Sequence, residues 1–302
     1  MNNFINYSSC PACNSAKIDS VLASRDYTVS QNDFEIFECS NCTLRFTQNV
    51  PNEESIGNYY KHESYISHTN EAKGLINNLY HLVRNFTLKT KRKLISQLVI
   101  NSSKRILDIG AGTGYFLNEM KNNGWEVLGL EPSVHARKVA YDTHQIELKD
   151  SSELSSLAKN YFDVITMWHV FEHVHRSKEY FKMMHDCLVK KGSLIIAVPN
   201  YTSKDAEVYK NKWAAYDVPR HVFHFSPQSL IQLASQNGFS IKKIKPMWFD
   251  SFYVCMLSEK NRNGKLSMLG FLKAIIIGFY SNLIALFNSK KCSSLIYIFE
   301  KN

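Results

Sequence analysis

The sequence predicts an α/β protein built on a parallel, doubly wound sheet. Four short apolar runs have the length and composition of buried strands, at 106–109, 127–130, 161–167 and 193–199. Helical patterns separate them. In one pattern apolar residues recur at helical spacing from Phe181 to Leu188, and Lys190–Gly192 predict its end. Strands that alternate with helices are typical of a parallel sheet covered on both faces.

The length and the later segments agree with this fold class. A chain of 302 residues with 44% hydrophobic content can hold one large domain and a small added module. Ser226 and Pro227 predict the start of another helix, and Gly238 predicts its end. An apolar run at 294–299 predicts a final strand that rejoins the sheet.

The turn after the first predicted strand carries the strongest functional signal. Asp108 stands near the end of that strand, and Gly110, Gly112 and Gly114 follow at every second position. Glycine permits a tight turn and lets a ligand approach the N–H groups at a helix start. Glu131 ends the next strand, where nucleotide-binding folds place the acid that binds ribose hydroxyls. The glycine spacing differs from G-x-G-x-x-G and the turn holds no lysine or arginine, which argues against a dinucleotide.

Together these residues resemble the first motif of class I S-adenosylmethionine-dependent methyltransferases. The resemblance implies a Rossmann-like sheet of seven strands, with a third strand at 145–148. It also implies that the Asp108 side of the loop contacts the methionine moiety, that Glu131 holds the ribose and that Asp150 lies at the adenine. The implied cofactor-binding residues are Asp108, Gly110, Ala111, Gly112, Gly114, Tyr115, Glu131, Asp150 and Met167.

Four cysteines near the N-terminus form two C-x-x-C pairs, Cys10 with Cys13 and Cys39 with Cys42. This spacing predicts a tetrahedral thiolate site for a structural Zn²⁺ in a small zinc ribbon. Two disulfides are the alternative. No basic start and apolar run precede the cysteines, so we expect a reducing, cytoplasmic environment, which favours zinc.

Histidines and acids gather after the fourth predicted strand and again beyond the fifth. A helix starting near 168 would place His169, Glu172 and His173 on one face. His221 belongs to the second group, with Arg220 beside it. These predicted catalytic residues have several open roles. One histidine could be a general base, or the two groups together could bind a divalent metal, with His169, Glu172 and His173 as its residues in the first group. The polar groups could instead hold the loop. Arg220 could also grip an acceptor carboxylate or phosphate.

The H-x-x-E-H pattern with a later histidine is similar to the metal sites of some methyltransferases that act on RNA ends or quinone precursors, where the first position is usually Glu. The whole chain resembles bacterial methyltransferases with an N-terminal four-cysteine zinc module. The segments that carry this resemblance are Trp-His-Val-Phe-Glu-His-Val and Asp-Val-Pro-Arg-His-Val-Phe-His-Phe-Ser, at 168–174 and 217–226. It implies methyl transfer to a small-molecule, sugar or lipid-linked glycan acceptor.

An RNA methyltransferase that uses the zinc module to bind RNA is the alternative. The net charge of +9 favours it. Against it, the basic residues are dispersed apart from 89–93 and 242–245, and no Asn/Asp-Pro-Pro-aromatic motif follows the fourth strand.

The predicted organisation has three parts: a zinc module at 1–48, a connector with pocket-covering helices at 49–100, and the methyltransferase domain at 101–302. An amphipathic helix is predicted at 76–99. The stretch from Leu269 to Phe287 is almost wholly apolar, and its length approaches a membrane span. Because a strand should follow it, we expect a helix at about 266–287 that either lies on an anionic membrane as a peripheral contact or covers the domain.

Overall fold

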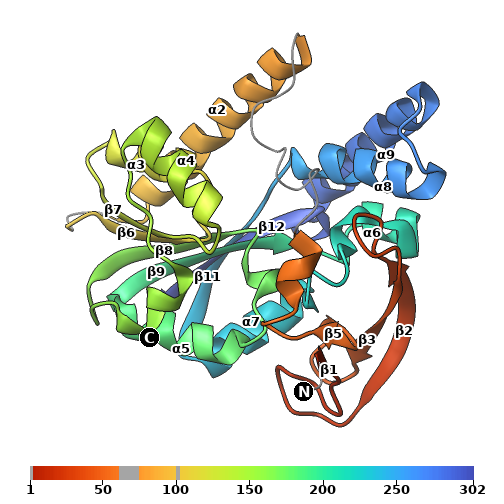
Figure 1. The fold of residues 1–302 in the computed structure, drawn as a ribbon, viewed down its shortest axis with the longest axis horizontal. Helices are drawn as coiled ribbons and strands as arrows, with labels where there is room; N and C mark the ends of the chain where they lie inside the picture. Colours follow the sequence, from red (N-terminus) through yellow and green to blue (C-terminus); the bar gives the residue numbers. More distant parts are fainter. Residues whose placement is uncertain (1–2, 61–74, 100–102) are drawn as a thin grey trace.

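The computed structural model describes residues 3–60, 75–99 and 103–302, and for 75–83 it describes the backbone alone. Its centre is a sheet between two layers of helices, with a small β module at one end and a helical hairpin projecting beside it (Figure 1). Much of the expected connector, at 61–74, lies outside the described residues, and the predicted domain limits stay a prediction.

The central sheet has six strands in the order β11-β12-β9-β8-β6-β7. The strands β7, β6, β8 and β9 pair in parallel, while β12 runs antiparallel between β9 and β11. The bounds are β6 Arg105–Ile109, β7 Glu126–Leu130, β8 Phe162–Trp168, β9 Leu188–Pro199, β11 Phe239–Pro246 and β12 Ser294–Lys301. The Rossmann-like fold is confirmed. The carboxyl ends of the parallel strands meet at one edge, which is where such folds bind ligands.

Two details of the predicted sheet are wrong. The described residues hold six strands instead of seven, because the expected third strand at 145–148 is reduced to one bridge between Leu130 and Lys149. Asp150 then caps a 3-10 turn, η2 (Ser151–Ser156), which takes the chain away from the sheet edge. The helix expected through Leu188 ends at Cys187. Residues 188–192 begin β9 instead, since pairing with β8 overrides the local end signal.

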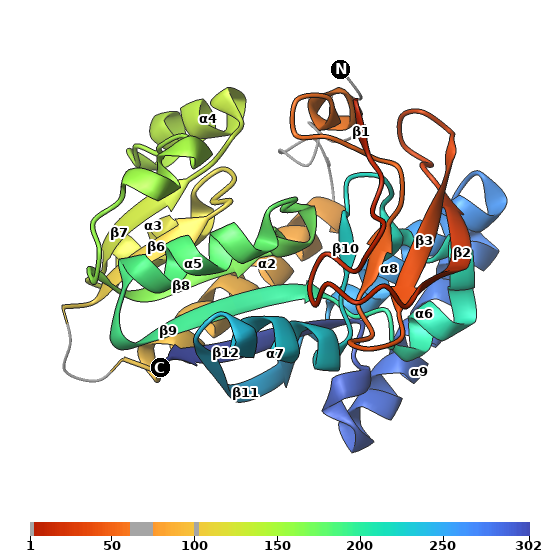
Figure 2. The ribbon, with the colours of Figure 1, turned by 90° about the horizontal axis from the view of Figure 1, so that it is seen from below.

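Helices cover both faces of the sheet. On one face lie α2 (Leu75–Ser96), α3 (Tyr115–Lys121) and α4 (Val134–His144), and on the other α5 (Ser177–Cys187) and α7 (Pro227–Gln236) (Figure 2). The predicted helix at 76–99 is thus confirmed as α2. Ser226 caps α7 in a capping box with Ser229, and Gly238 follows its end with a φ of 86°. These predictions are confirmed.

The N-terminal module is joined to the large domain by a shared sheet. The module contains β1 (Phe4–Ile5), β2 (Ile18–Arg25), β3 (Asp33–Cys39), β4 (Arg45–Thr47), β5 (Val50–Pro51) and the turn η1 (Ile56–Tyr60). Strand β10 (Phe223–His224), from the large domain, pairs antiparallel with β4. Phe46 and Phe223 are partners there and both are buried. The module therefore positions the chain segment that contains His221.

A helical hairpin lies between β11 and β12 in the sequence. It consists of α8 (Asp250–Asn263) and α9 (Met268–Phe287), and it lies beside α6 (Lys204–Tyr209) at the end of the molecule that carries the module (Figure 1). Short 3-10 turns complete the fold: η3 (Phe171–His173), η4 (Lys210–Lys212), η5 (Ala214–Tyr216) and η6 (Ser289–Lys291). The predicted final strand at 294–299 is confirmed as β12.

Candidate active site

The glycine turn connects β6 to α3 and leaves one open face. Gly110, Gly112 and Gly114 all have left-handed φ values, of 75°, 55° and 78°. A Cβ on Gly110 would lie 2.3 Å from Val170 Cγ2, and one on Gly114 would lie 3.0 Å from Ala140 Cβ. Around Gly112 nothing lies within 4 Å of that position. The outer two glycines are thus required by packing, while the middle one faces space that a ligand can occupy.

Two acids flank this turn. Asp108 is 2% exposed and accepts a hydrogen bond of 2.5 Å from Thr166 Oγ1. Burial raises the pKa of Asp108 to about 7, although Thr166 and the ammonium of Lys91 oppose that shift. Glu131, at the end of β7, accepts from the backbone N–H of Gly112 at 2.8 Å and of Ser133 at 3.0 Å. The structure therefore brings both predicted acids to the glycine turn.

Three other predicted cofactor residues lie near the same sheet edge. Tyr115 packs edge-on against His144, with a centroid distance of 4.5 Å. Met167 is fully buried in β8. Asp150 accepts from Ser152 and pairs with Arg137 at 2.8 Å. Their contact with the cofactor, like that of Ala111, stays a prediction.

Helix α2 lies over this region and adds a residue that the sequence did not reveal. Arg84 lies 4.0 Å above the Tyr115 ring, and Lys91 Nζ lies 4.0 Å from the centroid of Trp168. Burial lowers the pKa of Lys91 to about 8, against the pull of Asp108 and Asp250. A lysine in a basic stretch of an amphipathic helix gave no local signal for such a partly buried position.

The segment after β8 is a short turn instead of the predicted helix. His169 has a φ of 56°, and only Phe171–His173 form a 3-10 turn, η3. His169 therefore lies outside this turn, and although it contacts Glu172, its ring does not join the ligand atoms that Glu172 and His173 bring together. Its Nε2 lies 2.9 Å from Asp250 Oδ2, the first residue of α8, and its Nδ1 lies 3.5 Å from Glu172 Oε1. Burial lowers the pKa of His169, but these two carboxylates outweigh it and raise the pKa to about 10. The raised pKa favours the protonated form of His169, which makes it less suited than His173 to act as a base.

Glu172, His173 and His221 form a cluster of possible metal ligands that does not include His169. One ligand atom from each lies within 4.8 Å of the others. Glu172 is 1% exposed, and neither carboxylate oxygen accepts a hydrogen bond from the described part of the chain. Burial opposes its ionisation, yet the neighbouring His169 holds the pKa of Glu172 below its usual value. Apart from this ion pair, the buried carboxylate is left without hydrogen bonds in the described residues, and a ligand could complete it.

Both histidines of the cluster are oriented by backbone carbonyls. His173 Nδ1 lies 3.0 Å from the carbonyl oxygen of Arg220 and 2.9 Å from the hydroxyl of Tyr60. His221 Nδ1 lies 2.9 Å from the carbonyl oxygen of Ala215. A carbonyl can only accept, so Nδ1 carries a proton in each ring, and in the neutral form of the ring the lone pair is on Nε2. Metal-binding histidines are commonly held in this way. Burial, and then the nearby His221, lower the pKa of His173 to about 4, so that it is neutral at pH 7.

Arg220 does not face an acceptor. It is 1% exposed, and its guanidinium lies 2.6 Å from Asp217 and 3.2 Å from Asp26 of the N-terminal module. It also donates to Thr28. The hypothesis that Arg220 grips an acceptor anion is wrong, because its donors are used to join the module to the large domain.

The four cysteines of the module come together. The Sγ atoms of Cys10 and Cys42 are 3.5 Å apart and those of Cys13 and Cys39 are 3.6 Å apart, with all four within 4.8 Å. All four are free thiols, so neither disulfide of the alternative is present. Tetrahedral zinc thiolates place sulfurs about 3.8 Å apart. The cluster therefore fits the dimensions of the predicted zinc site.

Comparison with known proteins identifies the fold's family. A family model described as a methyltransferase domain matches residues 83–244. The chain belongs to this family. It is an S-adenosylmethionine-dependent methyltransferase, as the glycine turn and its acids predicted, and the donor assignment is confirmed at the level of the family.

The curated relatives of this methyltransferase are distant. A ubiquinone biosynthesis O-methyltransferase of Pelagibacter ubique is 26% identical over 184 residues, which cover 56% of this chain and 73% of the relative. The mitochondrial protein of that name in Rattus norvegicus is 26% identical, and the match covers 50% of this chain and 48% of the relative. An uncharacterized methyltransferase of Alkaliphilus oremlandii is 29% identical, with coverage of 33% and 47%. The chain thus spans about half the length of the last two relatives.

Solved structures agree on the fold. A SAM-dependent methyltransferase of Thermotoga maritima superposes with a TM-score of 0.50 at 19% identity, covering 75% of this chain and 96% of the other. At this identity the likeness concerns the fold alone.

Proposed function

We propose that this enzyme transfers the methyl group of S-adenosylmethionine to a hydroxyl oxygen of a small-molecule, sugar or lipid-linked acceptor held at the Glu172–His173–His221 cluster. The relatives from Pelagibacter ubique and Rattus norvegicus are named O-methyltransferases, which supports oxygen as the acceptor atom. The observation that carries the proposal is the buried Glu172 carboxylate, whose oxygens accept no hydrogen bond from the described residues and which lies within 4.8 Å of a ring nitrogen of His173 and one of His221.

The donor set of the cluster fits a divalent cation. Glu172 offers a carboxylate, and His173 and His221 each offer an Nε2 lone pair fixed by a carbonyl at Nδ1. Two imidazoles and one carboxylate suit Mn²⁺, Fe²⁺ or Zn²⁺ better than Ca²⁺ or Mg²⁺. A bound cation would lower the pKa of a coordinated acceptor hydroxyl. Of the residues predicted to bind a metal, Glu172, His173 and His221 would hold the cation, and His169 would not.

The protein would also lower the barrier by holding the donor and the acceptor in position. The glycine turn, Asp108 and Glu131 would hold the donor, and α2 with Lys91 would close the site from above. Holding methyl and hydroxyl in line can contribute roughly 7–11 kcal/mol to lowering the barrier. If no cation binds, the neutral His173 is the residue suited to accept the hydroxyl proton, because the raised pKa of His169 favours its protonated form.

An apolar cavity supports an acceptor with a hydrophobic part. A cavity of about 380 Å³ lies between α2 and the start of α8. Its lining includes Phe86, Leu94 and Trp248, and it shares Lys91 and Asp250 with the active site. An acceptor whose hydroxyl lies at the cluster could place an apolar group here.

Two cations of the basic run at 89–93, on which the RNA alternative rests in part, already have partners. Lys91 is partly buried over Trp168 and Arg92 pairs with Glu119 at 2.8 Å, while Lys89 and Lys93 are exposed. These two cations are therefore not available to bind phosphates.

We further propose that the four cysteines hold zinc. Elemental analysis of Cys42→Ser would check this as a loss of about one zinc per chain.

Methyl-labelled S-adenosylmethionine tests the function. We expect label in phenolic, sugar or lipid-linked hydroxyl acceptors and none in RNA. Glu172→Gln should lower turnover by about a hundredfold or more while leaving the affinity for S-adenosylmethionine unchanged, because the donor site does not include Glu172. The control Glu179→Gln removes a carboxylate from α5 that is 61% exposed and should keep full activity. Label in RNA, or full turnover of Glu172→Gln, would contradict the proposal.

A further inference from the structure

We propose that the α8–α9 hairpin docks this methyltransferase on the surface of an anionic lipid bilayer. The feature that carries this proposal is the orientation of α9. Its small residues are buried, and its large apolar residues face outward. A helix that merely covered the domain would bury the large residues.

The buried face of α9 is fixed against its neighbours. Its buried residues are all small: Gly270, Ala274, Gly278, Ser281 and Ala285. A Cβ on Gly278 would lie 2.8 Å from the ring of Phe252, and one on Gly270 would lie 3.6 Å from Glu259 Cβ. The two helices therefore pack closely and antiparallel. Ser281 also donates to the buried Asp205 at 2.8 Å. These contacts leave α9 no freedom to turn its large residues inward.

The outward face is a row of large apolar side chains along the whole helix. Met268 and Leu269 are 75% and 73% exposed at its start, Phe279 is 64% exposed, and Phe287 is 87% exposed at its end. Leu272, Ile276, Leu283 and Leu286 continue the row between them. Soluble proteins rarely leave such an extended apolar surface in water, and where they do it marks an interaction site.

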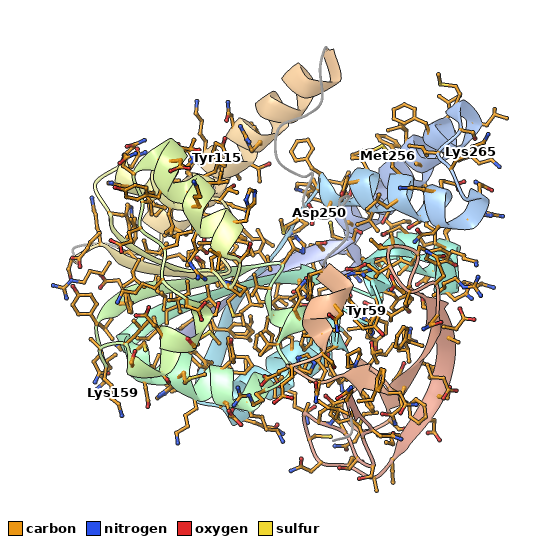
Figure 3. The ribbon with its side chains drawn as sticks, viewed as in Figure 1. Tyr59, Tyr115, Lys159, Asp250, Met256 and Lys265 are labelled. Carbon is orange, nitrogen blue, oxygen red and sulfur yellow. The ribbon has the colours of Figure 1, made fainter. Side chains whose placement is uncertain are left out.

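The charges around this row select the partner. Residues 260–299 contain six lysines and arginines and no aspartate or glutamate. Five of these cations are exposed: Lys260, Arg262, Lys265, Lys273 and Lys290. Figure 3 shows Lys265 at the outer end of the hairpin. A bilayer with anionic headgroups offers hydrocarbon and negative charge in one surface. A second copy of this chain would bring like charges together, so the charge pattern argues against a dimer.

The fold indicates that α9 lies on the bilayer and does not cross it. By length and composition, its 20 residues could span a membrane. However, its small face is covered by α8, which carries the buried Glu259, and β12 returns to the centre of the sheet from Ser294. Because α8 begins at Asp250, which lies 2.9 Å from His169, the docked hairpin would hold the acceptor cluster at a fixed place relative to the lipid.

Vesicle flotation of the whole chain tests the proposal without any need for turnover. We expect the protein to float with vesicles of phosphatidylcholine and phosphatidylglycerol, less so at high salt, and not with phosphatidylcholine alone. The double variant Ile276→Asp, Phe279→Asp changes two side chains that are 67% and 64% exposed. It should lower the bound fraction by about tenfold or more. The control Tyr141→Asp changes an apolar side chain on α4 that is 55% exposed and should bind like the wild type.

Wild-type protein that stays in solution with both kinds of vesicle would overturn the proposal. So would a double variant that floats as well as the wild type. If sedimentation velocity showed a dimer that the double variant abolishes, without vesicle binding, the row would be an interface between two copies and the proposal would be wrong. Unchanged affinity for S-adenosylmethionine in the double variant would show that its fold and donor site are intact.

Discussion

The buried carboxyl of Asp108 shows how single residues prepare the donor site. Burial raises its pKa, while Thr166 and Lys91 favour the ionised form. The neighbouring Lys91 is partly buried, and desolvation lowers its own pKa to about 8. A cationic ligand that arrives beside Asp108 therefore meets a carboxylate that water does not solvate, where electrostatic attraction is strong.

The affinity for S-adenosylmethionine should consequently depend on pH. The ligand carries positive charge and favours ionised Asp108, whose pKa is about 7 in the free protein. Affinity should be highest above about pH 7.5 and weaken as the pH falls through 7. Calorimetry across that range checks this. Asp108→Asn should bind weakly with little pH dependence, and a wild-type affinity that is constant with pH would contradict the assignment.

Residues close in sequence were predictable, and residues joined by the fold were not. Asp108 and Glu131 follow from their spacing around one turn, because a strand-turn-helix unit fixes their distance locally. Asp250 meets His169 only because α8 starts beside β8, and no local pattern records that. The charge of Arg220 suggested that it could grip an acceptor anion. Its burial depends on Asp26 of the N-terminal module, which is far away in the sequence.

At the scale of elements, β10 is the link between the two parts of the chain. It completes the sheet of β2, β3 and β4 while His221, three residues before His224, enters the acceptor cluster. Arg220 adds a buried ion pair to Asp26 across the same junction, and Asp26 is fully buried. An unpaired charge at such a place is strongly destabilising.

Arg220→Met should therefore lower the free energy of unfolding by about 3–5 kcal/mol, because Asp26 and Asp217 lose their buried cation. Urea unfolding of the whole chain measures this. Arg25→Met is the matched control, since Arg25 pairs with Asp33 in the same module but both side chains are about half exposed, at 47% and 58%. An equal, small effect of both substitutions would show that the buried pair does not stabilise the junction.

Elements with strong local signals were predicted well, and those set by tertiary contacts were not. The capping box at Ser226 and the apolar β12 gave correct bounds. The turn at 168–175 was mistaken for a helix because its histidine spacing suits one, whereas the close approach of Val170 to Gly110 requires a different path. The predicted edge strand at 145–148 is not formed. Only one bridge, between Leu130 and Lys149, remains, and no further strand pairs on its outer side in the described residues.

At the scale of the whole molecule, the fold brings together three parts of the chain: the glycine turn, the Glu172–His173–His221 cluster and the α8–α9 hairpin. The glycine turn follows β6, the Glu172–His173–His221 cluster includes the turn after β8, the strand that pairs with β6, and the α8–α9 hairpin begins at Asp250, which contacts His169 (Figure 3). The N-terminal module supports the cluster through β10. The fold and donor followed from the sequence, but this arrangement required the structure because its members lie far apart in the chain.

The Glu172–His173–His221 cluster is the proposed cation site on the acceptor side of the donor pocket. Titration of Mn²⁺ into the whole chain, with the free ion measured by electron paramagnetic resonance, tests it most directly. We expect a saturable site in wild-type protein that Glu172→Gln abolishes and Glu179→Gln retains, with the affinity for S-adenosylmethionine equal in all three. Binding of Mn²⁺ to Glu172→Gln as tight as to the wild type would contradict this proposal.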